Sequence, residues 1–277
     1  MAGCGTTGIP GGGTTTSPSS SPVPLTGRYV AMGSSFAAGS GTGPDIGSGC
    51  QRAADNYPHV VAKRFGLNLV DVTCAGATIA NLFDTPQDGR PAQLDAVTPD
   101  TRLVTITAGG NDLDYSAAIQ RCMEAARASK PCPGLPAATD LGQAAVALHS
   151  GLVRLIGALR ADAPDARIYI LGYPRIFPDP PATCTDNIIS AADTGRLTSI
   201  GLVLDATLRR SAADTDVSFV DVYTASVGHD VCASSTDRWL NGSDTYGIYY
   251  HPNATGVARV ADLLAEALEH RESGQPS

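Results

Sequence analysis

Short apolar runs alternate with longer amphipathic stretches along most of the chain. The runs are short and mostly apolar, which predicts buried β-strands at 28–32, 67–72, 103–107, 167–171 and 218–222. The stretches between them carry apolar residues three and four positions apart, which predicts helices at 56–65, 112–128, 140–160, 191–211 and 254–269. Strands that alternate with helices form a parallel sheet with right-handed crossovers. The pattern therefore predicts an α/β fold, a three-layer α/β/α sandwich around a central five-stranded parallel sheet.

The same pattern divides the chain into three parts. Residues 5–26 are mostly Gly, Thr, Ser and Pro, so 1–27 is predicted to be a flexible linker. One domain is predicted over 28–270, followed by a disordered tail over 271–277. A domain of this length buries about three quarters of its unfolded surface, so it needs no metal or partner to fold. The longest uncharged run, 1–27, is polar, so no membrane-spanning helix is predicted.

The composition and charge of the chain exclude some classes of function. The 277 residues are 43% hydrophobic and 17% charged, as in an ordinary globular protein. The 19 basic residues are outnumbered by 27 acidic ones, and the basic residues are scattered along the chain. This distribution offers no basic surface for a phosphate backbone, so nucleic acid is not expected as a partner. We find no Walker loop, dinucleotide fingerprint or metal-ligand cluster in the sequence, so neither a cofactor nor a metal site is expected.

The cysteines indicate the compartment. None of the spacings forms a Cys-x-x-Cys pair, which favours disulfides over a structural zinc site. The count of seven is odd, and the sequence alone does not choose the pairing of Cys4, Cys50, Cys74, Cys122, Cys132, Cys184 and Cys232. Cys4 follows Met-Ala-Gly, which looks like the end of a bacterial lipoprotein signal and makes Cys4 a candidate for lipidation. The alternative is a stray cysteine in a disordered tail, and both interpretations place the protein outside the reducing cytosol.

Candidate chemical groups follow three of the predicted strands and precede the last helix. They are Ser35 after the first strand, Gly76 after the second, Asn111 after the third and His251 before the helix. The carboxyl ends of parallel strands share one edge of the sheet, where ligands bind. A serine becomes nucleophilic when a base takes its proton, and the developing oxyanion needs N–H donors. Each residue also has a structural interpretation, since Ser35 and Asn111 suit helix caps, Gly76 suits a turn, and His251 suits a helix boundary.

Together these segments resemble the conserved blocks of the SGNH (GDSL-type) hydrolases. The similar segments are VAMGSSF at 30–36, CAGAT at 74–78, GGND at 109–112 and HPN at 251–253. The resemblance covers 28–269 and is closest to secreted actinobacterial esterases and lipases. It implies the flavodoxin-like fold of that family, with no cofactor. It also implies that Ser35 is the nucleophile and His251 the base, and that the oxyanion is held by Ser35, Gly76 and Asn111.

The resemblance has consequences for the cysteines and for the partners. It implies the disulfides Cys50–Cys74, Cys122–Cys132 and Cys184–Cys232, which leaves Cys4 free for lipidation. It also implies a small-molecule or lipid ester as substrate. A monomer is expected, although the sequence does not reveal the oligomeric state. The location is then secreted or extracytoplasmic, with a membrane tether through Cys4 if that residue is lipidated.

Two positions depart from the family pattern. Ser34 stands where the family has Asp before the nucleophile, so Ser34 is an alternative nucleophile, although Ser35 keeps the spacing from Gly33. The family often has Asp three residues before the base, where this chain has Ile248. Asp244 is seven residues away from His251, too far to replace it. We therefore expect the main-chain carbonyl of Ile248 to orient the imidazole, although a neutral carbonyl stabilises imidazolium less than a carboxylate does.

The leading hypothesis is a secreted or envelope-tethered serine esterase or lipase that forms an acyl-enzyme on Ser35. A second hypothesis is an acyltransferase that passes the acyl group to a sugar or lipid hydroxyl. A third is a catalytically inert envelope lipoprotein that binds lipid or glycan through a relic site. The sequence does not reveal the acyl chain length or the alcohol part of the substrate.

Overall fold

A computed structural model describes residues 1–3, 25–47, 49–243 and 248–272. In this part of the chain five parallel strands form one sheet in the order β2-β1-β3-β4-β5, which confirms the predicted sheet. The strands are β1 (Arg28–Gly33), β2 (Asn68–Asp71), β3 (Thr101–Thr107), β4 (Arg167–Leu171) and β5 (Ser218–Val220). The last strand ends two residues earlier than predicted, because the side chain of Asp221 accepts a hydrogen bond from Thr224 N and begins a short helix there.

Helices connect the strands, and the long ones lie where the periodicity predicts them. The helices are α1 (Ser35–Ala38), α2 (Tyr57–Phe65), α3 (Ile79–Phe83), the 3-10 helix η1 (Gln93–Ala96), α4 (Tyr115–Arg127), α5 (Ala138–Asp162), α6 (Ala191–Asp214), α7 (Val222–Ala225) and α8 (Ala254–Glu272). Four further helices, α1, α3, η1 and α7, were not predicted, because they are too short to show a helical period. The predicted helix at 112–128 begins only at Tyr115, because Asp114 has a left-handed backbone with φ of 57°.

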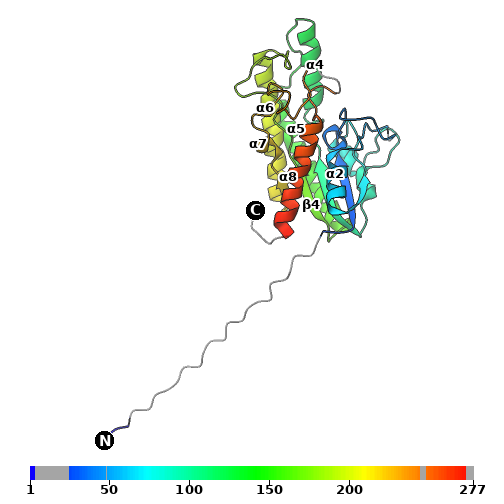
Figure 1. Ribbon diagram of the computed structural model, residues 1–277, viewed down its shortest axis with the longest axis vertical. Coiled ribbons are helices and arrows are strands. Elements are labelled where there is room, and N and C mark those ends of the chain that lie inside the picture. Colours follow the sequence, from blue (N-terminus) through cyan, green and yellow to red (C-terminus); the bar gives the residue numbers. More distant parts are fainter. Residues whose placement is uncertain (4–24, 48, 244–247, 273–277) are drawn as a thin grey trace.

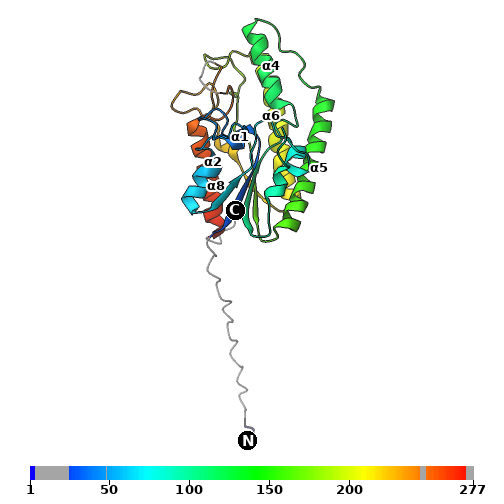
Figure 2. The ribbon, with the colours of Figure 1, turned by 90° about the vertical axis from the view of Figure 1, so that its right-hand side faces the viewer.

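The helices cover both faces of the sheet, as predicted for a three-layer sandwich. Figures 1 and 2 show α2 and α8 side by side on one face, with α5 and α6 on the other. Alternate strand residues feed two separate cores. Val104 and Ile106 of β3 join the core shared with α3 to α6, while Leu103 joins the core shared with α2 and α8. The two-residue period of the strands thus produces the two layers of packing.

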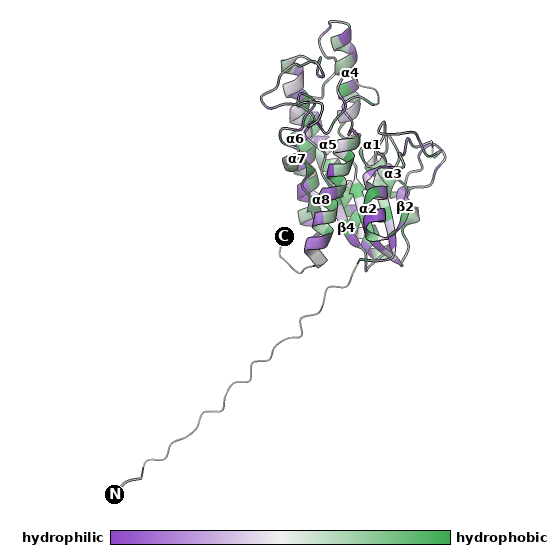
Figure 3. Ribbon diagram, in the orientation of Figure 1, coloured by the Kyte–Doolittle hydropathy of each residue, from purple (hydrophilic) through white to green (hydrophobic). Residues whose placement is uncertain are grey.

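Helix α5 is the one helix in the described ranges that is long and apolar enough to cross a membrane by length and composition. Such a helix was not predicted, because polar residues interrupt its apolar ones and leave no long unbroken apolar run. Its buried stripe of Leu148, Leu152, Leu155 and Leu159 packs into the core on the α5 side of the sheet. In Figure 3 the central strands of the sheet are coloured green, the colour of hydrophobic residues. Packing against the sheet accounts for this stripe, and 33% of the apolar window of α5 is buried.

Both ends of the folded domain extend beyond the predicted limits of 28–270. Leu25, expected in the linker, is only 6% exposed and packs into the core shared with α2 and α8. At the other end, α8 continues through Glu272 and so includes the first two residues of the expected tail. Cys4 and the rest of 4–24 lie outside the described residues, as do 273–277.

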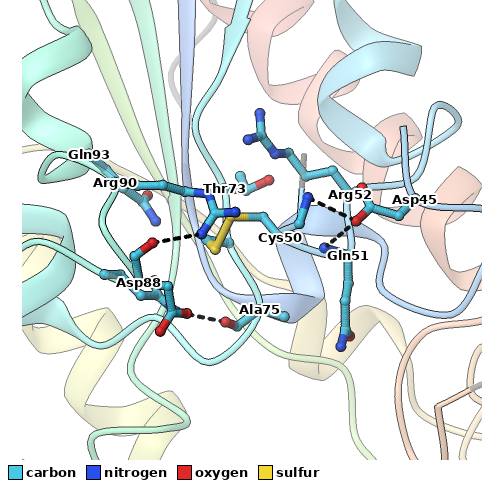
Figure 4. The surroundings of a disulfide bond; sticks show 12 residues. Asp45, Cys50, Gln51, Arg52, Thr73, Ala75, Asp88, Arg90 and Gln93 are labelled. Atoms are coloured by element: carbon cyan, nitrogen blue, oxygen red, sulfur yellow. Dashed lines mark hydrogen bonds between the residues drawn. A yellow bond between two sulfur atoms is a disulfide. The ribbon is translucent and has the colours of Figure 1, made fainter. Parts of the chain in front are cut away.

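Three disulfides fasten loops of the domain, with the pairing that the family resemblance implied. Cys50–Cys74 joins the loop before α2 to the loop after β2 (Figure 4), and Cys122–Cys132 joins α4 to the segment that follows it. Cys184–Cys232 joins the loop after β4 to the segment between α7 and α8. The bridged cysteines are separated by 24, 10 and 48 residues respectively. Disulfides of this kind persist in oxidising compartments.

The number of residues between the bridged cysteines predicts that the disulfides contribute differently to the free energy of unfolding. A disulfide restricts the unfolded chain more when it closes a longer loop, which gives about 4 kcal/mol for Cys184–Cys232 and about 3 kcal/mol for Cys122–Cys132. We expect the double variant Cys184→Ser/Cys232→Ser to lose more free energy of unfolding than Cys122→Ser/Cys132→Ser. Urea unfolding followed by circular dichroism measures both. A larger loss for the shorter loop would contradict the loop-length dependence.

Candidate active site

Ser35 stands at the turn between β1 and α1. Gly33, the last residue of β1, has φ of 148°, and any side chain there would collide with the carbonyl oxygen of Thr107 on the adjacent strand. The position therefore requires glycine. The turn makes Ser35 the first residue of α1 at the carboxyl edge of the sheet, with only 6% of the residue exposed. Its backbone N–H lies in the first turn of a helix, where amides have no intrahelical acceptor.

His251 meets Ser35 from the far end of the chain. The Ser35 Oγ lies 2.8 Å from His251 Nε2, although 216 residues separate them. The other ring nitrogen, Nδ1, lies 3.0 Å from the carbonyl oxygen of Tyr249. A carbonyl only accepts, so Nδ1 carries the ring proton and Nε2 is free to accept from the Ser35 hydroxyl. The pair is thus arranged for the imidazole to take the serine proton.

The prediction that the Ile248 carbonyl orients the imidazole is wrong. That carbonyl accepts from the backbone N–H of His251 at 3.3 Å and from Asn241 Nδ2 at 3.3 Å. The carbonyl of Tyr249 faces the ring instead, because the chain reverses at Tyr250, where φ is 57°. The spacing of the family's aspartate pointed to Ile248, whereas the turn selects the next carbonyl along the chain. Asp244, already judged too distant, lies outside the described residues.

Burial sets the protonation of His251. The residue is 7% exposed, and loss of hydration lowers the pKa of its imidazole below the ordinary value of 6.5. The hydrogen bond to the Tyr249 carbonyl raises the pKa, but by less than burial lowers it. Phe36 packs its ring against the imidazole with centroids 4.7 Å apart, which adds to the apolar surroundings. His251 is therefore neutral near pH 7 and able to act as a base.

Tyr173 joins the segments around the nucleophile, and the sequence analysis missed it. Its hydroxyl lies 3.2 Å from the Ser34 Oγ and accepts from Gly110 N at 3.3 Å. Its ring packs on Phe36 at 4.6 Å. Ser34 thus directs its hydroxyl at Tyr173, while the Ser35 hydroxyl faces the imidazole. Tyr173 lies two residues after the end of β4, so the rule that functional groups follow strands, when applied to the fourth strand, finds it.

Two of the three predicted oxyanion donors, Gly76 and Asn111, lie on loops that are bonded to each other. Gly76 is exposed, with φ of 81°, in the loop after β2. Asn111 donates one amide hydrogen from Nδ2 to the carbonyl of Ala77 at 2.9 Å, which leaves its second amide hydrogen for another acceptor. Asp112 accepts from Ile79 N at 3.0 Å, and burial raises the pKa of its carboxyl. The loops after β2 and β3 are therefore held as one unit beside β1.

An apolar crevice adjoins the imidazole. Its walls are mostly aromatic and aliphatic side chains from α1, α4, the loop after β4 and the segment before α8, including Phe36, Ile119, Ile176, Tyr249 and Tyr250. Only about 10 Å³ of it is open to water, which is close to the space of one water molecule. A larger apolar group needs these side chains to move apart before it can enter.

Comparison with known proteins finds relatives over most of the chain. A sequence model of the GDSL-like Lipase/Acylhydrolase family matches residues 31–259. "Lipase 2" of Streptomyces coelicolor is 35% identical over 254 residues, which cover 87% of this chain and 85% of that protein.

Two solved structures are similar in fold and in sequence. Phospholipase A1 from Streptomyces albidoflavus superimposes with a TM-score of 0.70 at 26% identity, covering 86% of this chain and 98% of the other. The extracellular lipase from Streptomyces rimosus gives a TM-score of 0.68 at 25% identity, covering 87% and 99%.

The lowered pKa of His251 predicts the pH dependence of any reaction that uses it as a base. Protonation abolishes the base, so we expect the acid limb of kcat/KM to lie below pH 6.5. Between the folded pKa and 6.5 the unfolded chain binds more protons, so the free energy of unfolding falls as the pH drops through that window. A pH profile and urea titrations measure both effects, with His251→Gln as the control for stability. An acid limb at or above pH 6.5 would contradict the expectation.

Proposed function

The chain belongs to the GDSL-like lipase/acylhydrolase family, and we propose that it is an extracytoplasmic serine esterase or lipase with Ser35 as nucleophile. The observation that carries this proposal is the 2.8 Å contact between the Ser35 hydroxyl and the free nitrogen of a neutral imidazole. The relatives named above are lipases and a phospholipase, all of which are carboxylic ester hydrolases. Ser34 is a poor alternative, because its hydroxyl contacts Tyr173.

In the proposed acylation step, the Ser35 Oγ attacks the carbonyl carbon of the ester and its proton passes to His251 Nε2. The carbonyl oxygen becomes an oxyanion, for which the N–H groups of Ser35 and Gly76 and the free amide hydrogen of Asn111 are the donors. The tetrahedral intermediate then expels the alkoxide, which takes the proton from His251 and leaves as the alcohol. Ser35 is left as an acyl ester.

In the proposed deacylation step, His251 takes a proton from water as the water oxygen attacks the acyl carbon. The same donors stabilise the second oxyanion, and the Ser35 Oγ leaves with the proton from the imidazolium, which releases the carboxylic acid. The Tyr249 carbonyl, 3.0 Å from Nδ1, keeps the ring in the required tautomer through both steps. A carbonyl carries only a partial charge, so it stabilises the imidazolium less than an aspartate does.

The apolar crevice beside His251 favours an ester with an apolar acyl or alkyl part. Its walls are mostly aromatic and aliphatic and include no Asp, Glu, Lys or Arg, and it lies next to the base. Such a site recognises a substrate by burial of hydrocarbon rather than by charge. We therefore assign the substrate to small-molecule or lipid esters, with the crevice opening to admit hydrocarbon.

The three disulfides support a location in an oxidising, extracytoplasmic compartment. Lipid attachment at Cys4 is a separate proposal, which rests on the Met-Ala-Gly-Cys sequence. In the cells that produce this protein, we expect the wild-type chain in the membrane fraction and Cys4→Ser in the soluble fraction. Ester hydrolysis per molecule should be equal, because the site lies in the folded domain. A wild-type chain found only in the soluble fraction would contradict the anchor.

The nucleophile is tested by hydrolysis of a p-nitrophenyl ester series from short to long acyl chains. We expect Ser35→Ala to lose at least about 10³-fold in kcat, because no nucleophile remains for the imidazole to activate. Ser34→Ala is the matched control, and we expect it to keep activity within about tenfold, because its hydroxyl does not face His251. The chain-length profile separates a short-acyl esterase from a lipase.

The same assay distinguishes the alternative functions. Product analysis with added sugar or lipid alcohols reveals an acyltransferase, since the acyl group then appears on the acceptor rather than as free acid. A wild-type chain that hydrolyses no ester, transfers no acyl group and does not react at Ser35 with a fluorophosphonate would leave only a binding protein. Equal loss of activity in Ser34→Ala and Ser35→Ala would argue against Ser35 as the single nucleophile.

A further inference from the structure

Gln93 makes two hydrogen bonds to the residue that ends β1. Its Oε1 accepts from Gly33 N at 2.7 Å, and its Nε2 donates to Gly33 O at 3.0 Å. Gln93 is the first residue of η1 and is only 5% exposed, so both bonds form away from solvent. We propose that Gln93 is a positioning residue for the reaction, which fixes the nucleophile relative to the oxyanion loop. This inference rests on the proposed function.

The peptide between Gly33 and Ser34 leads directly into the nucleophile, and it is fixed on both sides. Its N–H, from Ser34, donates to the carbonyl of Thr107 on β3 at 2.9 Å. Its carbonyl oxygen, from Gly33, accepts from Gln93 Nε2 and also from Cys74 N at 3.0 Å. A peptide held at its oxygen and at its nitrogen cannot rotate about the chain axis. Ser35 begins its helix one residue later, so the orientation of this peptide sets the direction of the Ser35 side chain.

The carbonyl of Gly33 also connects the nucleophile to the oxyanion loop. Cys74, which shares that carbonyl with Gln93, precedes Gly76 by two residues. Gln93 lies in the surroundings of the Cys50–Cys74 disulfide (Figure 4). One acceptor atom thus receives one bond from η1 and one from the loop that carries Gly76. If Gln93 is lost, the Gly33 carbonyl keeps the bond from Cys74 but loses the bond from η1, and Gly33 N loses its acceptor, so the end of β1 is held less tightly.

The second bond explains why a glutamine suits this position. Gly33 N is buried at the end of β1, and without Oε1 it loses its acceptor, which is unfavourable for a buried donor. A primary amide supplies one acceptor and one donor about as far apart as the N–H and C=O of one residue. The helix η1 is itself fastened to β1, since Arg28, the first residue of that strand, donates to Ala96 O at 3.0 Å. The bond between Arg28 and Ala96 therefore fixes the position of η1, and with it Gln93, relative to β1.

The test uses the full chain with two substitutions at one position. Gln93→Met keeps the length of the side chain but makes neither bond. Gln93→Glu keeps an acceptor for Gly33 N but places an oxygen opposite Gly33 O. Competent sites are counted by titration with a fluorophosphonate, and kcat and KM for a p-nitrophenyl ester are expressed per titrated site. We expect kcat per site to fall by about 10²-fold in Gln93→Met with KM little changed, because displacement of the nucleophile affects the reacting geometry more than binding.

A control variant distinguishes a positioning role of Gln93 from an effect on stability alone. Ser211→Ala removes two hydrogen bonds of a buried side chain away from the site, from Ser211 Oγ to Thr207 O at 2.8 Å within α6 and between Ser211 Oγ and His149 Nδ1 at 3.0 Å. We expect this control to lower the free energy of unfolding but to keep the wild-type kcat per titrated site. The acid limb of the pH profile should not move in either Gln93 variant, because the surroundings of His251 are intact.

The outcomes separate this inference from the proposed function. Wild-type kcat per titrated site in Gln93→Met overturns the positioning role while leaving the esterase proposal in place. An inactive wild-type chain that does not react at Ser35 overturns both. If Gln93→Met does not accumulate as folded protein, Gln93→Glu measured in the same way decides, since it retains the bond from Gly33 N. An unchanged kcat per site in Gln93→Glu then overturns the role of the donor bond.

Discussion

The close contact between Gly33 and Thr107, at the end of the pairing between β1 and β3, determines where the reacting groups lie. Because Gly33 has no side chain, its backbone comes against the carbonyl of Thr107, and Ser34 N donates to that same carbonyl. The two strands thus end at the same level. The chain crosses to β2 on one side of β1 and then to β3 on the other, so the loops after all three strands surround Ser35.

The base reaches this point by a different route. Tyr250, with φ of 57°, is buried beside His251 and donates from its hydroxyl to Asn187 Oδ1 at 3.1 Å. Asn187 is itself fully buried and exchanges backbone hydrogen bonds with Cys184, which is bridged to Cys232. The loop after β4 therefore anchors the turn that carries the imidazole. Side-chain packing and a disulfide thus hold the base in position, whereas strand pairing holds the nucleophile in position.

The neutral partner of the imidazole explains the direction of its pKa. A carboxylate at Nδ1 would favour the protonated ring and raise the pKa, against the effect of burial. The carbonyl of Tyr249 carries no net charge, so burial outweighs it and the pKa of His251 is lowered. The absence of an aspartate at position 248 thus produces a base that stays neutral over a wider pH range. In return, the imidazolium that forms during the reaction is stabilised less.

The sequence by itself determined the layers of the fold, because the periods of apolar residues in strands and helices persist whatever the tertiary contacts. It also placed Ser35, Gly76, Asn111 and His251 at element boundaries, and the family resemblance assigned the cysteine pairing. Only the tertiary structure decided which carbonyl faces His251, since that depends on the backbone turn at Tyr250. It alone showed the bonds of Gln93 and Tyr173, because contacts between residues 60 and 139 positions apart leave no local pattern in the chain.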